Sequence, residues 1–205
     1  LADAAGNDRY HAEVDAHITG RGSGHTHKRV TSSHAQGAGI GRRGDISDGH
    51  AWAGGLGALL DLTGNDTYEA GNWAIGAAYW FATGLLYDGA GDDTYRSVYY
   101  ALASGAHFCL SAVIDESGDD QYRAWDPPIA DDLVPAGQGM NAAGGAGLAF
   151  GWDFTSTLLL DKSGNDQYSA RIISGGLAMI RSTAILADLG GDDEYVLPAG
   201  RGGGM

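Results

Sequence analysis

An eight-residue motif, Asp-x-x-Gly-(Asn/Asp)-Asp-x-Tyr, occurs six times in this chain of 205 residues. Its copies begin at Asp3, Asp61, Asp88, Asp115, Asp161 and Asp188 and end at Tyr10, Tyr68, Tyr95, Tyr122, Tyr168 and Tyr195. Three of the five steps from one leading Asp to the next are 27 residues long, and the other two are 58 and 46. A fixed period in this range is typical of stacked repeats, in which each unit packs on its neighbours.

The residues around the motif predict strands joined by turns. Two positions before the leading Asp, every copy carries a large aliphatic residue: Leu1, Leu59, Leu86, Val113, Leu159 and Leu186. Small or branched residues lie four positions before it, so the alternation predicts a strand with one face inward. Asp at the first position and Gly at the fourth suit a type I turn, whose Asp side chain can accept from the turn's own N–H groups. Glycines such as Gly76, Gly84 and Gly105 interrupt the segments that a helical repeat would need.

We therefore predict an all-β fold, a right-handed parallel β-helix with about 27 residues per coil. At about 3.3 Å per residue, such a unit makes one triangular coil of three short strands. We expect residues 1–205 to form a single solenoid domain that is a piece of a longer protein. Insertions are predicted at about 11–50 and 123–142, where the step lengthens. Three of the four prolines lie in the second of these segments, as is typical of a protruding loop.

Stacking would place the motif aspartates in rows about 4.8 Å apart. Like charges at that spacing raise one another's pKa unless something compensates them. Turn N–H groups could saturate each carboxylate, or Ca²⁺ could lie between successive coils with carboxylate and carbonyl ligands. Both alternatives are open from the sequence, and no other cofactor is predicted. The candidate ligands are the leading and following aspartates of the motif: Asp3, Asp8, Asp61, Asp66, Asp88, Asp93, Asp115, Asp120, Asp161, Asp166, Asp188 and Asp193.

The second half of the motif resembles the RTX nonapeptide, Gly-Gly-x-Gly-(Asn/Asp)-Asp-x-(large apolar). RTX proteins are secreted parallel β-rolls that bind Ca²⁺, and the resemblance implies the same turn chemistry here. It carries over to a glycine and to the Asp two positions later in each copy, at Gly6, Gly64, Gly91, Gly118, Gly164 and Gly191. RTX repeats every 9 residues rather than 27, and its Gly-Gly opening is replaced here by Asp-x. The resemblance covers about eight residues per coil.

Aromatic and basic residues predict a second kind of surface. The Tyr that ends each motif predicts a stacked aromatic ladder inside the solenoid rather than a binding platform. Both predicted insertions leave the repeat directly after a motif Tyr, at Tyr10 and Tyr122, and so emerge from the same corner. The residues near that corner are similar in composition to the carbohydrate-binding sides of other β-helix proteins. The candidate binding surface consists of His11, Trp73, Arg96, Tyr99, Arg123, Trp125 and Arg171.

The charge balance excludes two classes of partner. The chain has 26 acidic and 12 basic residues, which gives a formal net charge of −14. Such a field repels nucleic acid and anionic membrane surfaces. No apolar run is long enough to span a membrane, so membrane insertion is not expected. The single cysteine, Cys109, lies in an apolar stretch and predicts a buried structural thiol.

These observations favour an extracellular or cell-envelope module with a structural or adhesion role. Its expected partners are a polysaccharide, a cell-surface or matrix protein, or a second copy that stacks end to end through unpaired strand edges. The alternatives are a carbohydrate-active β-helix enzyme (a polysaccharide lyase or hydrolase) and a docked subunit of a larger assembly. The sequence has no Gly-x-Ser-x-Gly elbow, no phosphate loop and no His-Glu-x-x-His, so the catalytic residues are unknown and a non-enzymatic role is favoured.

Overall fold

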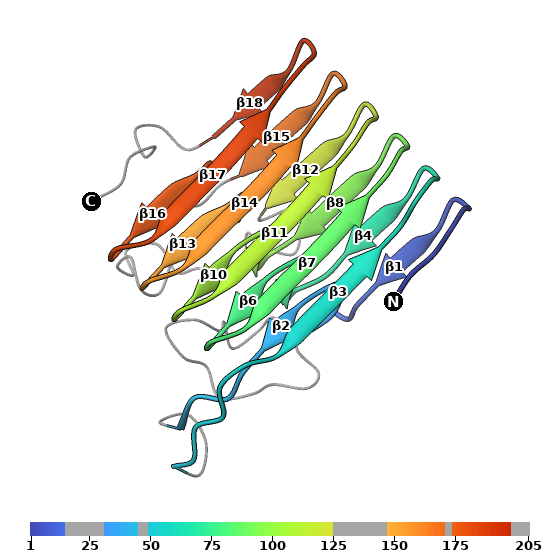
Figure 1. Cartoon of the computed structure of the whole chain (residues 1–205). Coiled ribbons are helices and arrows are strands. Elements are labelled where there is room, and N and C mark those ends of the chain that lie inside the picture. Colours follow the sequence, from blue (N-terminus) through green and yellow to red (C-terminus); the bar gives the residue numbers. More distant parts are fainter. Residues whose placement is uncertain (15–30, 45–48, 125–146, 171–173, 198–205) are drawn as a thin grey trace.

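The computed structural model describes residues 1–14, 31–44, 49–124, 147–170 and 174–197 as a stack of parallel strands (Figure 1). All eighteen elements in these ranges are strands, and every pairing between them is parallel. The prediction of an all-β fold built from parallel sheets is confirmed, and the architecture is compatible with a parallel β-helix. No helix in these ranges is long and apolar enough to cross a membrane.

Three sheets run along the stack. The Tyr sheet contains β1 (Arg9–His11), β4 (Thr67–Glu69), β8 (Thr94–Ser97), β12 (Gln121–Ala124), β15 (Gln167–Ala170) and β18 (Glu194–Val196). The long sheet contains β3 (Leu56–Leu60), β7 (Thr83–Asp88), β11 (Leu110–Asp115), β14 (Ser156–Asp161) and β17 (Thr183–Asp188). The short sheet contains β2 (Gly39–Ile40), β6 (Ala78–Tyr79), β10 (Gly105–Ala106), β13 (Phe150–Trp152) and β16 (Leu177–Met179). A further pair joins β5 (Asn72–Ala74) to β9 (Tyr99–Ala101).

The motif sets the register, because each copy lies beside the next and forms one row of the stack. In the Tyr sheet, Tyr68 pairs with Tyr95 and Tyr95 with Tyr122. In the long sheet, Asp88 pairs with Asp115. Rows are bonded to each other across sequence separations of 27, 46 or 58 residues. Chain length therefore varies between rows while the motif position stays constant.

The interior is filled by columns of like residues. Four of the predicted inward residues, Leu59, Leu86, Val113 and Leu159, are 0–2% exposed, whereas Leu186 is partly buried and Leu1, at the end of the stack, is 75% exposed. The motif tyrosines stack with ring centroids 4.8–4.9 Å apart and planes within 7° of each other. Tyr95 and Tyr122 are fully buried. The prediction of an interior aromatic ladder is thus confirmed.

The corner between the short and long sheets has an unusual backbone. Two consecutive residues in each row have positive φ, as at Trp80 and Phe81 (59° and 55°) and at His107 and Phe108 (67° and 62°). Large side chains rarely adopt this conformation, which costs about 1–2 kcal/mol per residue. Hydrogen bonds between rows offset this cost, since Phe81 N–H donates to the carbonyl of His107 at 2.9 Å and Phe108 N–H donates to that of Asp153 at 3.0 Å.

The segments outside the regular rows are only partly described. Part of the predicted 11–50 insertion joins the stack, because β2 pairs with β6 and Ser32 bridges Asn72. Most of the predicted 123–142 insertion lies outside the described residues. Cys109 is buried as predicted, and burial raises the pKa of its thiol to about 11.

Candidate metal centre

The leading Asp lies at or next to the end of a long-sheet strand in five of the motifs, and in several copies one of its oxygens closes the turn, whereas Oδ1 of Asp61 and of Asp88 is buried without a hydrogen-bond partner among the described residues. Asp115 Oδ1 accepts from Ser117 N–H at 3.2 Å, and Asp161 Oδ1 accepts from Ser163 N–H at 3.1 Å. The other oxygen accepts from the Tyr of the preceding row, since Tyr95 donates to Asp115 Oδ2 at 2.6 Å. Asp115 and Asp161 therefore each cap their own turn and also join two rows.

The following Asp joins rows through the backbone. Asp66 N–H donates to Asp93 Oδ1 at 2.5 Å, and Asp93 N–H donates to Asp120 Oδ1 at 2.6 Å. The same bond links Asp8 to Asp66 and Asp120 to Asp166. A carboxylate oxygen is thus held within 2.7 Å of a backbone nitrogen at each of these steps. The aspartates form one continuous column along the corner between the long sheet and the Tyr sheet, which we call the aspartate corner.

The second oxygen of the following Asp has a different environment. The Oδ2 atoms of Asp8, Asp66, Asp93, Asp120 and Asp166 are buried and have no hydrogen-bond partner among the described residues. Four of these five residues are at most 2% exposed, Asp8 being the exception. A buried, unpaired carboxylate oxygen is costly, so each of these atoms needs a proton or a cation.

The residues that carry these unpaired oxygens belong to five groups of three aspartates. In each group one oxygen from every residue lies within 4.8 Å of the others. The groups are Asp3–Asp8–Asp61, Asp66–Asp88–Asp93, Asp93–Asp115–Asp120, Asp120–Asp161–Asp166 and Asp166–Asp188–Asp193. All twelve residues predicted as ligands are therefore brought together, and neighbouring groups from the second onward share a following Asp.

Crowding and burial alter the acidity of the column. Burial, reinforced by neighbouring carboxylates, raises the pKa of Asp66 to about 6 and that of Asp93 to about 8. The same causes raise the pKa of Asp115 and of Asp166 to about 7. Near neutral pH the column therefore holds protons unless a cation replaces them.

The donor set suits a hard divalent cation. Carboxylate oxygens are the ligands that Ca²⁺ and Mg²⁺ prefer, and three meet in each group. The unpaired Oδ2 atoms point to a missing positive partner at the same places. The groups of aspartates can thus hold metal ions. The tyrosine donors of the column were missed from the sequence, although their constant place two positions after the following Asp was visible there.

The predicted binding-surface residues do not form one patch. Trp73 and Tyr99 are 3% and 2% exposed and lie in the core beside the short sheet, where the Trp73 ring stacks on that of Tyr100 at 4.4 Å. Arg123 lies in β12, on the Tyr sheet. Trp125 and Arg171 lie outside the described residues.

The other two predicted residues meet at Glu69, on the outer face of the Tyr sheet. His11 Nδ1 and Arg9 Nη2 both lie 2.9 Å from Glu69 Oε2, and Arg96 Nη1 lies 3.8 Å from Oε1. Hydrogen bonds from His11 and Arg9 lower the pKa of Glu69 despite its partial burial. These residues belong to β1, β4 and β8, so the cluster joins three rows. Their opposite charges neutralise one another locally.

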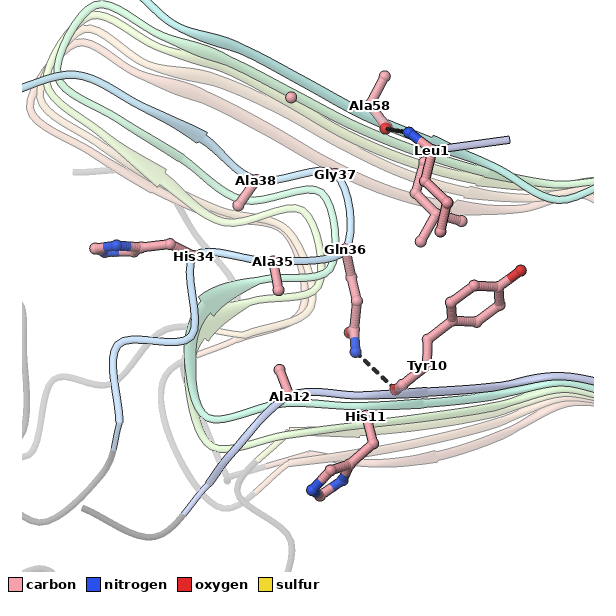
Figure 2. Close-up of a pocket in the computed structure, with 12 residues that line it drawn as sticks. Leu1, Tyr10, His11, Ala12, His34, Ala35, Gln36, Gly37, Ala38 and Ala58 are labelled. Carbon is pink, nitrogen blue, oxygen red and sulfur yellow. Dashed lines mark hydrogen bonds between the residues drawn. The ribbon is translucent and has the colours of Figure 1, made fainter. Parts of the chain in front are cut away.

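A pocket of about 320 Å³ lies at the row that contains β1 (Figure 2). Leu1, Tyr10, Ala12, Gln36 and Leu59 line it together with neighbouring residues. The Gln36 amide donates to the carbonyls of Tyr10 and Glu69, at 2.7 and 3.0 Å. Since β1 is an edge strand of its sheet, this pocket is the open end of the interior in the described part of the chain.

A polar cluster links the first predicted insertion to the corner of the stack. His107 Nδ1 lies 2.7 Å from Asp153 Oδ2, and its Nε2 lies 3.0 Å from Arg43 Nη1. The Arg43 guanidinium also lies 5.5 Å from the centre of the Trp80 ring. With both ring nitrogens engaged, this imidazole joins two segments rather than presenting a general base.

Comparisons with protein-family models, curated proteins and solved structures found no match to this chain. Its function is therefore inferred from the aspartate column and from the surfaces beside it.

Proposed function

We propose that this chain is a structural β-solenoid module whose coils are joined by a column of Ca²⁺ ions bound between the motif aspartates. The module serves an extracellular or cell-envelope protein, in an adhesion or matrix role. Calcium sites in extracellular modules have dissociation constants of about 10⁻⁴–10⁻³ M. Sites of similar affinity here would be filled in a medium whose calcium concentration exceeds that range. The likeness of the turns to the second half of the RTX nonapeptide supports the same choice of ion.

The finer architecture belongs to this proposal. The chain is a right-handed parallel β-helix with about 27 residues per coil and insertions at about 11–50 and 123–142. The repeated separation of 27 residues between bonded rows supports the coil length. The handedness rests on the general rule that parallel strands in one sheet are joined by right-handed crossovers.

One observation carries the proposal: each group of aspartates contains a buried carboxylate oxygen with no hydrogen-bond partner among the described residues. Charge balance points the same way. The twelve leading and following aspartates carry up to twelve negative charges, and five divalent ions would supply ten positive ones. Without an ion, protons on residues such as Asp93, whose pKa is raised to about 8, would have to neutralise the column instead.

Thermal unfolding with and without the ion tests the proposal. The melting temperature should rise when about 5 mM CaCl₂ replaces about 5 mM EDTA, because an ion that binds only the folded state stabilises it. The same concentration of MgCl₂ should have a smaller effect, since Mg²⁺ gives up its water reluctantly and these groups are buried. Equal melting temperatures in CaCl₂ and EDTA would show that the aspartates cap turns without binding calcium.

A further inference from the structure

The long sheet turns an apolar face outward. One outward column consists of Ala58, Leu85, Ala112, Leu158 and Ile185. A second column, two positions later in each strand, runs from Leu60 to Ala187 and is also uncharged. The whole chain contains 38 charged residues (26 acidic and 12 basic), so their exclusion from both columns is marked. The strands of this sheet form a row across the front of the stack in Figure 1.

Several side chains on this face are well exposed. Ile185 is 47% exposed, Leu60 38%, and Leu110, at the start of β11, 52%. Large exposed apolar surfaces mark sites of interaction with another molecule. The inward face of the long sheet is covered by the interior, whereas the outward face lacks a cover among the described residues.

A ladder of phenylalanines borders the same face. Phe81, Phe108 and Phe154 are 42–46% exposed and lie just before the strands β7, β11 and β14. Their ring centroids are 4.7 and 4.8 Å apart, with planes within 6° of parallel. The Phe108 ring is therefore stacked on both sides, and the Arg181 guanidinium lies 5.6 Å from the centre of the Phe154 ring.

This surface chemistry excludes several occupants. A sugar stacks on the face of an aromatic ring and requires several hydrogen-bonding groups, whereas here the Phe108 ring is stacked on both sides and Tyr87 is the one residue of the two columns with a hydroxyl. The hydroxyls of Thr83, Ser156 and Thr183 lie at the starts of the strands, along one border of the face. An anionic membrane is disfavoured by the net charge of −14. A flat, uncharged surface of regular strands instead fits another flat, uncharged sheet, packed at about 10 Å as in a β-sandwich.

The size of the face fits a second copy of the chain. Six residues along a strand and five strands across give about 20 by 24 Å, or roughly 500 Å² per partner. Two such faces bury about 1,000 Å², which is the lower limit for a specific interface, and the phenylalanine ladder enlarges the area further. An identical sheet also has the same row spacing, so its side chains can fit between those of the first around a twofold axis.

We propose that the outward face of the long sheet, with the Phe81–Phe108–Phe154 ladder at its border, is the interface of a homodimer. It joins two acidic solenoids through their uncharged faces and leaves the aspartate corner of each copy accessible. The proposal is independent of the metal column, because the residues of this face belong to none of the aspartate groups.

Sedimentation or light scattering on the full chain tests the dimer. The wild-type protein should have about twice its monomer mass of 21.1 kDa at concentrations of about 10–100 µM. The double variant Leu85→Lys/Leu158→Lys should return to the monomer mass, because it places charges on the face. The control Gln121→Lys/Gln167→Lys adds the same two charges on the Tyr sheet and should leave the dimer intact.

Several outcomes would overturn the proposal. A wild-type monomer throughout this range would do so, as would a dimer that persists in the Leu85→Lys/Leu158→Lys variant. A wild-type monomer that floats with neutral phosphatidylcholine vesicles would assign the face to lipid instead. If circular dichroism shows that the variant is unfolded, carbene labelling of the wild type replaces it: labelling of Leu85, Leu158 and Ile185 should fall as protein concentration rises, and constant labelling contradicts the dimer.

Discussion

Tyr122 donates a hydrogen bond of 2.7 Å to Asp161 Oδ2, which lies 39 residues further along the chain in the next row. Tyr68 and Tyr95 make the same bond to the leading Asp of the row after theirs. The pattern breaks at Tyr168. Tyr195 donates to Asp188 at 3.0 Å within its own row, and the buried Tyr168 hydroxyl has Asp188 as a neighbour but makes no hydrogen bond of good geometry to it. The same side chain in the same column therefore makes a hydrogen bond of good geometry in one row and none in another.

This difference predicts unequal effects of removing the hydroxyl. Tyr122→Phe should lower the free energy of unfolding by about 1–3 kcal/mol, because it leaves Asp161 Oδ2 buried without its donor. Tyr168→Phe should change it by less than about 0.5 kcal/mol, because only a contact of poor geometry with Asp188 is lost. Urea unfolding followed by fluorescence measures both, and the Tyr168 variant is the control for ring packing. Equal losses would contradict the role given to the tyrosine–aspartate bond.

A second prediction concerns the motif glycines. A Cβ on Gly118 would lie 1.5 Å from the carbonyl oxygen of Gly91, at a φ of +157°. Gly118→Ala should therefore cost about 3 kcal/mol or more, because the backbones of two rows must separate. At Gly190 a Cβ would meet nothing closer than 3.9 Å, so Gly190→Ala should change stability by about 1 kcal/mol or less. Thermal unfolding of the two variants decides the point, and similar melting temperatures would show that the rows are not in close backbone contact.

Two adjacent aspartates separate ion binding from turn structure. Asp120 is buried and belongs to two aspartate groups, whereas Asp119 is exposed and belongs to none. Asn already occupies the column of Asp119, at Asn65 and Asn165. Asp120→Asn should thus remove most of the stabilisation by Ca²⁺, while Asp119→Asn should retain it.

The measurement is the rise in melting temperature on adding calcium to each variant. With the ion bound, both substitutions remove one negative charge, so a general effect of charge on the calcium-bound state would act on both alike. Loss of the calcium response in Asp119→Asn, or its retention in Asp120→Asn, would argue against ions in the buried column.

The raised pKa values of the buried aspartates predict a pH dependence whose sign changes with the ion. Without metal, the folded state holds protons on Asp66 and Asp93, whose pKa values of about 6 and about 8 exceed the unfolded value of about 3.9. The folded state then binds more protons than the unfolded chain, so stability should fall as the pH rises from about 4 to about 8. With saturating Ca²⁺ the carboxylates are held ionised and protons compete with the ion, so stability should rise over the same interval. Urea titrations between pH 5 and 8, in EDTA and in CaCl₂, measure both slopes; slopes of the same sign would contradict the competition.

Much of the fold follows from the repeat itself. The constant offset between Leu86 and Asp88, and between Asp88 and Tyr95, predicts an inward strand, a turn and a stacked ring, and each of these is present. The strand pairing of β2 was not predicted, because residues 20–49 show little alternation of apolar and polar residues.

Other features could not be predicted because their cause lies between rows. Bulky residues such as Trp80 and Phe81 give no sequence signal for positive φ, which the hydrogen bonds of the neighbouring row stabilise. The burial of Trp73 likewise depends on contacts with Tyr100, 27 residues away in the chain. At the aspartate column the sequence identified the ligands but not the oxygens that lack a partner, since these depend on which atoms the backbone and tyrosine donors already occupy.

The central claim is that the aspartate column binds divalent ions, and the number of ions bound per chain tests it most directly. After equilibrium dialysis against about 1 mM CaCl₂, elemental analysis should find several calcium ions per folded chain, up to one for each of the five groups of aspartates. Asp120→Asn should lower that number, because Asp120 belongs to two groups. A folded wild-type protein that retains no calcium above the dialysis buffer would contradict the account and leave the aspartates as proton-sharing turn caps.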